Sequence, residues 1–300
     1  MTKLSTKHVL TGHELSKHDI EMLLTLACQM KSNPLLHANA FPNQCVALIF
    51  EKPSLRTRFS FTAAISQLGA QAIESVTASR KSELPQDFIR VIQGYCQAMM
   101  IRTFDDEDLA VMKAYAKIPI INGLTDKFHP CQSLADLMTL YEVFGQLDGL
   151  KIAYLGDGNN VLHSLMLLAN KMGVTVHYCC PPGFEPDQSV IEMLEDPAMV
   201  KAFSHPQEAV MNCHAVYTDV WTSMGFAQKN EQDFQGYQVN EALMANAQEN
   251  AVFMHCMPME RGKEVSETLP DAPNSVIFQQ SENRMHVQKA LLYLLMNYGE

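Results

Sequence analysis

A cluster of hydroxyl and basic side chains follows the first strongly apolar segment of the sequence. Residues 50–61 read Phe-Glu-Lys-Pro-Ser-Leu-Arg-Thr-Arg-Phe-Ser-Phe, which places Ser54 and Thr57 where a strand ends and a helix begins. Backbone N–H groups at a helix start lack intrahelical partners and carry partial positive charge. Arg56 and Arg58 add formal charge in the same few residues. These are the components of a phosphate site, although an ordinary capped helix with two solvated arginines has the same pattern.

Other side chains that could take part in catalysis or binding stand singly at the ends of apolar segments. Arg102 follows residues 98–101, and His129 precedes a proline. Asp219 and Cys256 come at the ends of two further strand-like segments. Taken alone, each has a structural explanation: a surface arginine, a turn histidine, a turn carboxylate and a buried thiol. The residues by themselves therefore leave structural and functional interpretations open.

A glycine-containing turn after residues 151–155 invites a dinucleotide-binding interpretation. Gly156-Asp157-Gly158 supplies two glycines of a G-x-G-x-x-G pattern, but Val161 stands where the third would fall. Because the third glycine allows the helix to pack closely on the strand, this broken pattern supports a dinucleotide-dependent oxidoreductase only weakly.

The elements that must position these side chains alternate along the chain. Apolar periodicity predicts strands at residues 44–50, 71–76, 98–101, 118–122, 151–155, 174–179, 214–220 and 251–255. It predicts helices at residues 15–31, 57–68, 87–95, 105–115, 133–144 (capped by Ser133), 161–172 and 282–296. This alternation favours an α/β fold with parallel sheets, and a break at residues 145–149 divides it into two lobes.

The composition limits the class of protein. With 300 residues, 47% hydrophobic and 18% charged, the chain is expected to fold into one or two domains. No apolar run approaches the ~20 residues of a membrane span, and the first residues lack a signal-peptide core. The eight cysteines form no CxxC pair, so we expect a reduced, cytoplasmic protein. The net charge of −11 argues against a nucleic-acid partner, so a bound anion would need a local cationic cluster.

Five motifs, in order, resemble those of the aspartate/ornithine carbamoyltransferase family. Ser54-Leu55-Arg56-Thr57-Arg58 resembles its carbamoyl phosphate signature, and His129-Pro130-Cys131-Gln132 resembles its His-Pro-x-Gln motif. The motifs at residues 219–225, 255–258 and 282–284 continue the family's order and point to its ornithine branch.

The resemblance implies an α/β fold of two lobes, each a parallel sheet flanked by helices, with a C-terminal helix that returns to the N-terminal lobe. Residues 1–133 with helix 286–300 would bind carbamoyl phosphate, and residues 134–285 would bind ornithine.

The family's donor site maps onto ten residues of this chain. Those expected to hold carbamoyl phosphate are Ser54, Leu55, Arg56, Thr57, Arg102, His129, Gln132, Cys256, Met257 and Arg284. By resemblance, His129 donates to the carbamoyl oxygen and Gln132 pairs with the carbamoyl amide. Arg58 is expected to form a structural ion pair instead.

The family's acceptor site maps onto four residues. Asn160 would hold the α-amino acid end of ornithine, and Asp219 would pair with an ammonium group. Ser223 and the backbone of Met224 would complete the contacts.

The implied reaction is carbamoyl transfer to the side-chain amine of L-ornithine, giving citrulline and phosphate. An alkylammonium has a pKa of about 10.4, so the site must help to remove a proton. A deprotonated Cys256 or the departing phosphate would accept it, while Arg56, His129 and Arg284 would stabilise developing charge. No metal or organic cofactor is expected, because carbamoyl phosphate is already activated and no Cys/His cluster has ligand spacing.

The chain departs from the family pattern in one loop and at two single positions. In ornithine members, a loop after the second strand often carries a Gln that reaches the neighbouring subunit. Residues 74–86 are a few residues short and offer no equivalent Gln, so Ser79, Arg80 and Lys81 are the candidates to replace it. Leu55 stands where Thr is frequent and Met257 where Leu is usual, and both are expected to keep their backbone contacts.

Two alternative functions remain open from the sequence. One is a carbamoyltransferase for another amine or amino acid, and the other is a non-catalytic ligand-binding relative. For assembly, the resemblance implies a homotrimer or a multiple of it. The expected partners are the two small-molecule substrates, with neither nucleic acid nor a membrane among them.

Overall fold

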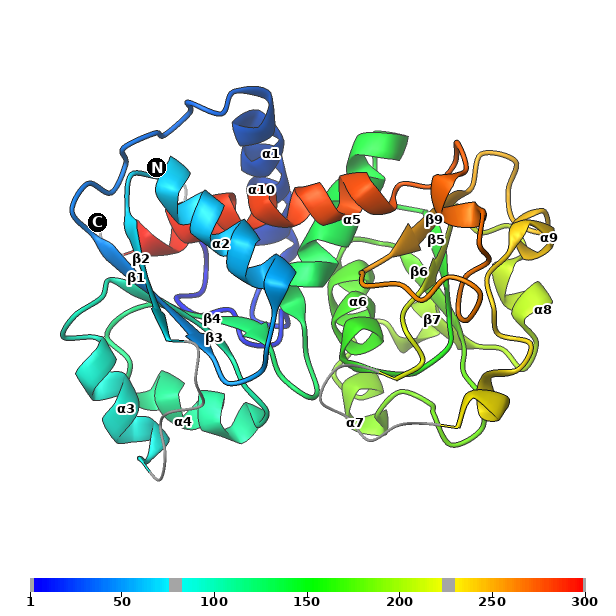
Figure 1. Ribbon diagram of the computed structural model, residues 1–300, viewed down its shortest axis with the longest axis horizontal. Coiled ribbons are helices and arrows are strands. Elements are labelled where there is room, and N and C mark those ends of the chain that lie inside the picture. Colours follow the sequence, from blue (N-terminus) through cyan, green and yellow to red (C-terminus); the bar gives the residue numbers. More distant parts are fainter. Residues whose placement is uncertain (1–2, 76–82, 223–229, 299–300) are drawn as a thin grey trace. The chain divides into compact units, whose positions relative to one another are not determined.

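The computed structural model describes residues 3–75, 83–222 and 230–298 (Figure 1). The chain divides into two compact units, Met1–Met138 with Glu282–Glu300, and Thr139–Ser281. Two helices have residues in both units, α5 (Pro130–Phe144) and α10 (Ile277–Met296). The domain boundaries predicted after residues 133 and 285 fall within these same helices. None of the helices described has an apolar stretch long enough to span a membrane.

The first unit is built on a four-stranded parallel sheet in the order β2-β1-β3-β4. Its strands are β1 (Cys45–Phe50), β2 (Gln71–Ser75), β3 (Ala98–Arg102) and β4 (Ile120–Leu124). Its own helices are α1 (Lys17–Ser32), α2 (Leu55–Gln67), α3 (Pro85–Ile92) and α4 (Asp106–Tyr115).

Helices lie on both faces of this sheet, with α3 and α4 on one side and α1 and α2 on the other (Figure 1). Ile49 and Ile101 point to the α3–α4 side, where they join a buried cluster with Ile89, Leu109 and Met112. Because alternate residues of a strand point to opposite faces, strands covered on both sides must be continuously apolar. This explains why β1 and β3 read as unbroken apolar runs.

The second unit is built on a five-stranded parallel sheet in the order β7-β6-β5-β8-β9. Its strands are β5 (Lys151–Leu155), β6 (Thr175–Cys179), β7 (Val200–Ala202), β8 (Ala215–Thr218) and β9 (Val252–His255). Its helices are α6 (Asn160–Lys171), α7 (Gln188–Ile191), α8 (Pro206–Val210) and α9 (Glu241–Met244), with short 3₁₀ turns at Pro197–Met199, Glu231–Phe234 and Leu269–Asp271. Strand β7 was not predicted, because it has only three residues, none of them buried.

The α/β architecture with two parallel sheets is confirmed, but two predicted helix starts were wrong. Helix α5 begins at Pro130, before the predicted cap Ser133, which is buried inside the helix. Proline is compatible with the first helical position because its missing N–H would have no intrahelical partner there. Helix α10 begins at Ile277, earlier than the predicted residue 282.

The carboxyl ends of the strands carry the side chains singled out from the sequence. In the first unit, Ser54 follows β1, Arg102 ends β3 and His129 follows β4. In the second unit, Asp219 follows β8 and Cys256 follows β9. Parallel strands run in one direction, so within each unit these ends meet at one edge of the sheet, where ligands of open α/β sheets bind.

Candidate functional site

The start of α2 gathers polar groups from three parts of the first unit. Ser54 is the N-cap, and its Oγ accepts a hydrogen bond from the Thr57 backbone N–H at 3.3 Å. Arg102 donates from Nη1 to the same Oγ at 3.3 Å. Arg284 of α10 donates from Nη2 to Thr57 Oγ1 at 2.7 Å. The helix start and two guanidinium groups therefore form one cluster, called here the cationic cradle together with Arg56.

Within the cationic cradle, Arg102 is buried beside two other positive charges. Burial, reinforced by the nearby charges of Arg284 and Arg56, lowers the pKa of Arg102 to about 10. Arg102 is only 7% exposed, and its buried Nε has no hydrogen-bond partner within the described residues. Like charges brought together in a buried site oppose ionisation, and an anion relieves that opposition. The geometry thus suits a phosphate group.

Two further polar side chains of the first unit lie at the start of α5. His129 is buried, and burial followed by the charges of Arg284 and Arg102 holds its pKa well below the usual range, so the ring is neutral near pH 7. Gln132 donates from Nε2 to Asp136 Oδ1 at 2.8 Å. Its Oε1 is buried with no partner within the described part of the chain. A buried carbonyl oxygen of this kind suits an N–H donor on a ligand.

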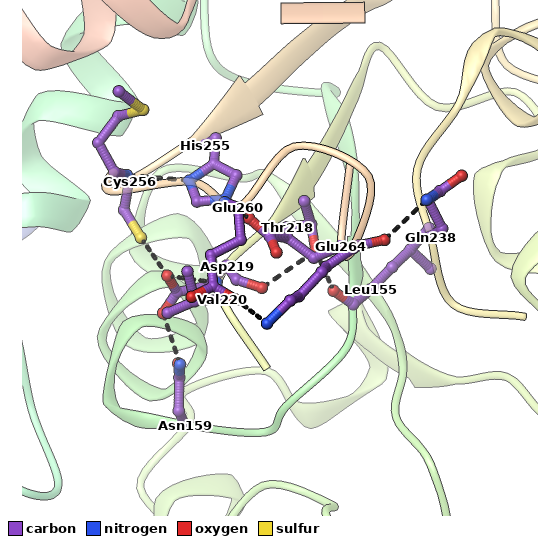
Figure 2. A network of polar contacts seen from close by, with 12 residues as sticks. Leu155, Asn159, Thr218, Asp219, Val220, Gln238, His255, Cys256, Glu260 and Glu264 are labelled. Carbon is purple, nitrogen blue, oxygen red and sulfur yellow. Dashed lines mark hydrogen bonds and ion pairs between the residues drawn. The ribbon is translucent and has the colours of Figure 1, made fainter. Parts of the chain in front are cut away.

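The second unit brings three donors onto the carboxylate of Asp219 (Figure 2). Asn159 Nδ2 donates to Oδ2 at 2.7 Å, and the Val220 N–H donates to Oδ1 at 2.8 Å. The Cys256 thiol donates to Oδ1 at 2.9 Å. Asp219 and Cys256 are both buried, at 6% and 7% exposure. The thiol proton of Cys256 is therefore hydrogen-bonded directly to the carboxylate of Asp219.

Asn160, which was predicted to hold ornithine, is the buried first residue of α6, and sequence reasoning gave no role to its neighbour Asn159. Asn159 caps α6, because its Oδ1 accepts from the Val161 N–H at 3.0 Å. The Tyr154 hydroxyl donates to the same oxygen at 3.2 Å. These contacts turn the Asn159 amide nitrogen toward Asp219. The preference of asparagine for the N-cap position is the signal that identifies this residue.

Asp219, His255 and Cys256 also place ligand-type atoms within 4.8 Å of one another. Carboxylate, imidazole and thiolate are all ligands of Zn²⁺. Both ring nitrogens of His255 are engaged, however, Nδ1 by the Met257 N–H and Nε2 by Glu264. A cation would therefore have to displace one of these contacts. Sequence spacing gave no sign of the cluster, because its members come from two different strand ends.

The remaining predicted residues are distributed as follows. Leu55 is 65% exposed at the start of α2, and Met257 lies in the second unit beside Cys256. The ion pair predicted for Arg58 is present, with Glu74 of β2 as its partner. Ser223 and Met224, and the loop candidates at residues 79–81, lie outside the described residues.

Both units match known sequence families, and the whole chain resembles solved structures. Residues 7–142 match the carbamoyl-P binding domain of aspartate/ornithine carbamoyltransferase, and residues 148–295 match its Asp/Orn binding domain. Ornithine carbamoyltransferase of Anoxybacillus flavithermus is 45% identical over 98% of this chain and 98% of its own length. The Bacillus subtilis enzyme of that name is 43% identical over 100% of this chain and 97% of its own.

Among solved structures, ornithine carbamoyltransferase from Pyrococcus furiosus has a TM-score of 0.93 at 39% identity and covers 99% of both chains. The structure of that name from Thermus thermophilus has a TM-score of 0.90 at 37% identity, covering 97% of this chain and 99% of its own. With both domains matched and relatives aligned over nearly their full lengths, the chain belongs to the aspartate/ornithine carbamoyltransferase family.

Proposed function

We propose that this protein transfers the carbamoyl group of carbamoyl phosphate to the side-chain amine of L-ornithine, giving L-citrulline and phosphate. The observation that carries the proposal is the cationic cradle, where burial and the charges of Arg284 and Arg56 lower the pKa of Arg102 and the start of α2 suits a phosphate. The full-length likeness to relatives that bear the name ornithine carbamoyltransferase supports the same reaction.

In the proposed donor site, the phosphate group is held by Arg102, Arg56, the side chains of Ser54 and Thr57, and the backbone of Leu55. His129 donates to the carbamoyl oxygen, and Gln132 Oε1 accepts from the carbamoyl amide. Arg284, Cys256 and Met257 complete the donor contacts. The buried, partnerless Oε1 of Gln132 supports its role, because an unmade buried hydrogen bond costs about 1–3 kcal/mol that a ligand N–H recovers.

The proposed chemistry is attack of a neutral amine nitrogen on the carbamoyl carbon. A C–N bond forms, the C–O bond to phosphate breaks, and phosphate leaves with the bonding electrons. The amine must lose protons, one before and one during the reaction, to Cys256 or to the departing phosphate. The hydrogen bond from the Cys256 thiol to Asp219 supports this role as a relay, in which the carboxylate takes the thiol proton while the sulfur receives a proton from the amine. Arg56, His129 and Arg284 stabilise the charge that develops on the carbamoyl and phosphate oxygens.

The acceptor residues favour an amino acid with a cationic side chain. Asp219 presents a carboxylate that pairs with an ammonium, whereas the side chain of aspartate would bring a second carboxylate against it. We assign Asn160, together with Ser223 and the Met224 backbone, to the remaining contacts with ornithine.

The proposal extends to assembly as a homotrimer, or a multiple of it, in the cytoplasm. Three large apolar side chains of α2 and β2 are exposed, Leu55 at 65%, Phe59 at 67% and Ile73 at 48%. An interface with another subunit would cover exposed apolar side chains of this kind. All eight cysteines are free, which agrees with a reducing compartment. Light scattering of the purified protein would measure the assembly directly.

A panel of acceptors tests the reaction. Purified protein is given carbamoyl phosphate with L-ornithine, putrescine, L-aspartate or L-lysine, and the carbamoylated products are quantified. The proposal requires citrulline as the main product. Faster carbamoylation of another acceptor would show a different carbamoyltransferase. Calorimetric binding of carbamoyl phosphate with no product from any acceptor would show a non-catalytic relative.

A further inference from the structure

A second buried pair lies directly behind Cys256. His255, the last residue of β9, and Glu264 are both inaccessible to solvent. His255 Nε2 and Glu264 Oε1 are 3.0 Å apart, and the same oxygen accepts from the Glu260 backbone N–H at 2.6 Å (Figure 2). The second oxygen, Oε2, is buried without a hydrogen-bond partner in the described part of the chain.

The hydrogen bonds determine which ring nitrogen of His255 carries the proton. The Met257 backbone N–H donates to Nδ1 at 2.9 Å, so Nδ1 is an acceptor and the proton lies on Nε2. Nε2–H therefore donates to Glu264. Both contacts select this tautomer, because the other one would put two N–H groups against each other at Met257 and two acceptors against each other at Glu264.

This tautomer holds the backbone on both sides of Cys256. The His255 N–H is held by Gln280 Oε1 at 2.9 Å, and the Met257 N–H is held by the His255 ring. Met257 has a φ of 61°, a left-handed conformation that a residue with a side chain adopts only when its surroundings enforce it. The thiol between these two anchored residues is thereby kept 2.9 Å from Asp219.

The burial of Glu264 is not explained by stability. A carboxylate with one oxygen unpartnered pays a desolvation penalty, and buried ionisable pairs are often no more stable than apolar residues of the same volume. Both ring nitrogens of His255 are occupied, by Met257 and Glu264, so the ring has no nitrogen left to exchange a proton with the thiol.

We infer that Glu264 is a positioning residue, which sets the tautomer of His255 and so fixes the Cys256 thiol against Asp219. The inference rests on the proposed function for its catalytic consequence. It predicts that what matters at residue 264 is a hydrogen-bond acceptor and that its negative charge is dispensable.

Two substitutions of nearly equal size separate these properties. Glu264→Gln keeps an acceptor oxygen without charge, and Glu264→Met fills the same volume with no acceptor for Nε2–H. For Glu264→Met we expect kcat/KM for ornithine to fall about 100-fold, the loss typical of a misplaced reacting group, while KM for carbamoyl phosphate changes less than about twofold. For Glu264→Gln we expect values within a few-fold of wild type and an unchanged pH profile.

Glu260→Ala is the matched control on the same loop. Its side chain pairs with Lys263 at the surface, and the substitution leaves the backbone N–H that contacts Glu264 in place. Wild-type kinetics are expected. If Glu264→Met does not fold, Glu264→Asp replaces it, because the shorter carboxylate cannot reach Nε2 from the same backbone and must show the same selective loss.

Alkylation of Cys256 tests the position of its thiol without depending on carbamoyl transfer. The rate of its reaction with iodoacetamide is followed by peptide mass spectrometry, which distinguishes it from the other cysteines. Glu264→Met should accelerate the labelling of this buried thiol at least about tenfold, and Glu264→Gln should not. Equal labelling in all variants, or a Gln variant as impaired as the Met variant, would overturn the inference. Altered labelling in a protein that makes no citrulline would instead retain it and remove the proposed function.

Discussion

Replacing Arg102 with methionine should stabilise the ligand-free protein and remove its response to phosphate. Burial and the charges of Arg284 and Arg56 lower the pKa of Arg102, which means that the folded state disfavours the charged guanidinium. At pH 7 the group is charged in both the folded and the unfolded chain, so this cost is fully present. Methionine is unbranched, fits irregular spaces and removes the charge.

The size of the effect follows from the shift in pKa. Lowering from 12.5 to about 10 corresponds to roughly 3 kcal/mol at 1.36 kcal/mol per unit. Loss of the Arg102 hydrogen bond to Ser54 lowers the free energy of unfolding by about 1 kcal/mol. The free energy of unfolding should therefore rise by about 2 kcal/mol, which raises Tm by about 3 °C for a protein of this size.

Thermal unfolding with and without inorganic phosphate measures both consequences. Phosphate should raise the Tm of the wild type, because a ligand that binds only the folded state stabilises it, and should leave Arg102→Met unchanged. Arg90→Met is the control, since Arg90 is half exposed and pairs with the exposed Asp87 and the face of Tyr115. Its free energy of unfolding should change by no more than about 0.5 kcal/mol. A variant at Arg102 that melts below wild type, or that still responds to phosphate, would refute the reasoning.

Four other measurements probe separate parts of the molecule. Cys256→Ala should lower kcat and raise KM for ornithine while calorimetric binding of carbamoyl phosphate persists; loss of both would indicate a packing role. Activity should rise between about pH 6 and 8.5 as more ornithine becomes neutral, and a flat profile would contradict rate control by the amine. Burial, then two lysine charges, lower the pKa of His8 to about 4, so urea unfolding should show stability falling as pH drops from about 6.5 toward 4; His8→Asn, which can still accept from the Ile120 N–H, should flatten that fall. A Cβ on Gly158 would lie 2.4–2.6 Å from the backbone of residues 184–186, so Gly158→Ala should cost about 1–3 kcal/mol in the same unfolding assay.

Only part of the cationic cradle could be predicted from local sequence. Residues 54–58 predict a capped helix start with added positive charge, because the capping and basic residues lie within about one helical turn. The lowered pKa of Arg102 is different, because it arises first from burial and then from the charges of Arg284, which belongs to the last helix, and Arg56. No local pattern indicates that α10 would place its arginine on Thr57, since that contact joins residues far apart in the chain.

The acceptor side of the molecule depends still more on tertiary structure. Asn159, Asp219 and Cys256 follow three different strands, β5, β8 and β9, and they meet because these strands are neighbours in one parallel sheet. Strand order is decided by long-range packing, which a single sequence does not express, so the contact of Asn159 with Asp219 could not be predicted.

By itself, the sequence determined the α/β class, the division into two lobes and the family motifs, because apolar periodicity and helix caps are local properties of the chain. Only the tertiary structure decided which polar atoms share a proton, which charges are crowded and which carboxylate is buried behind Cys256. Those properties depend on distances of a few ångströms between segments that are far apart along the chain, and such distances exist only once the sheets have formed.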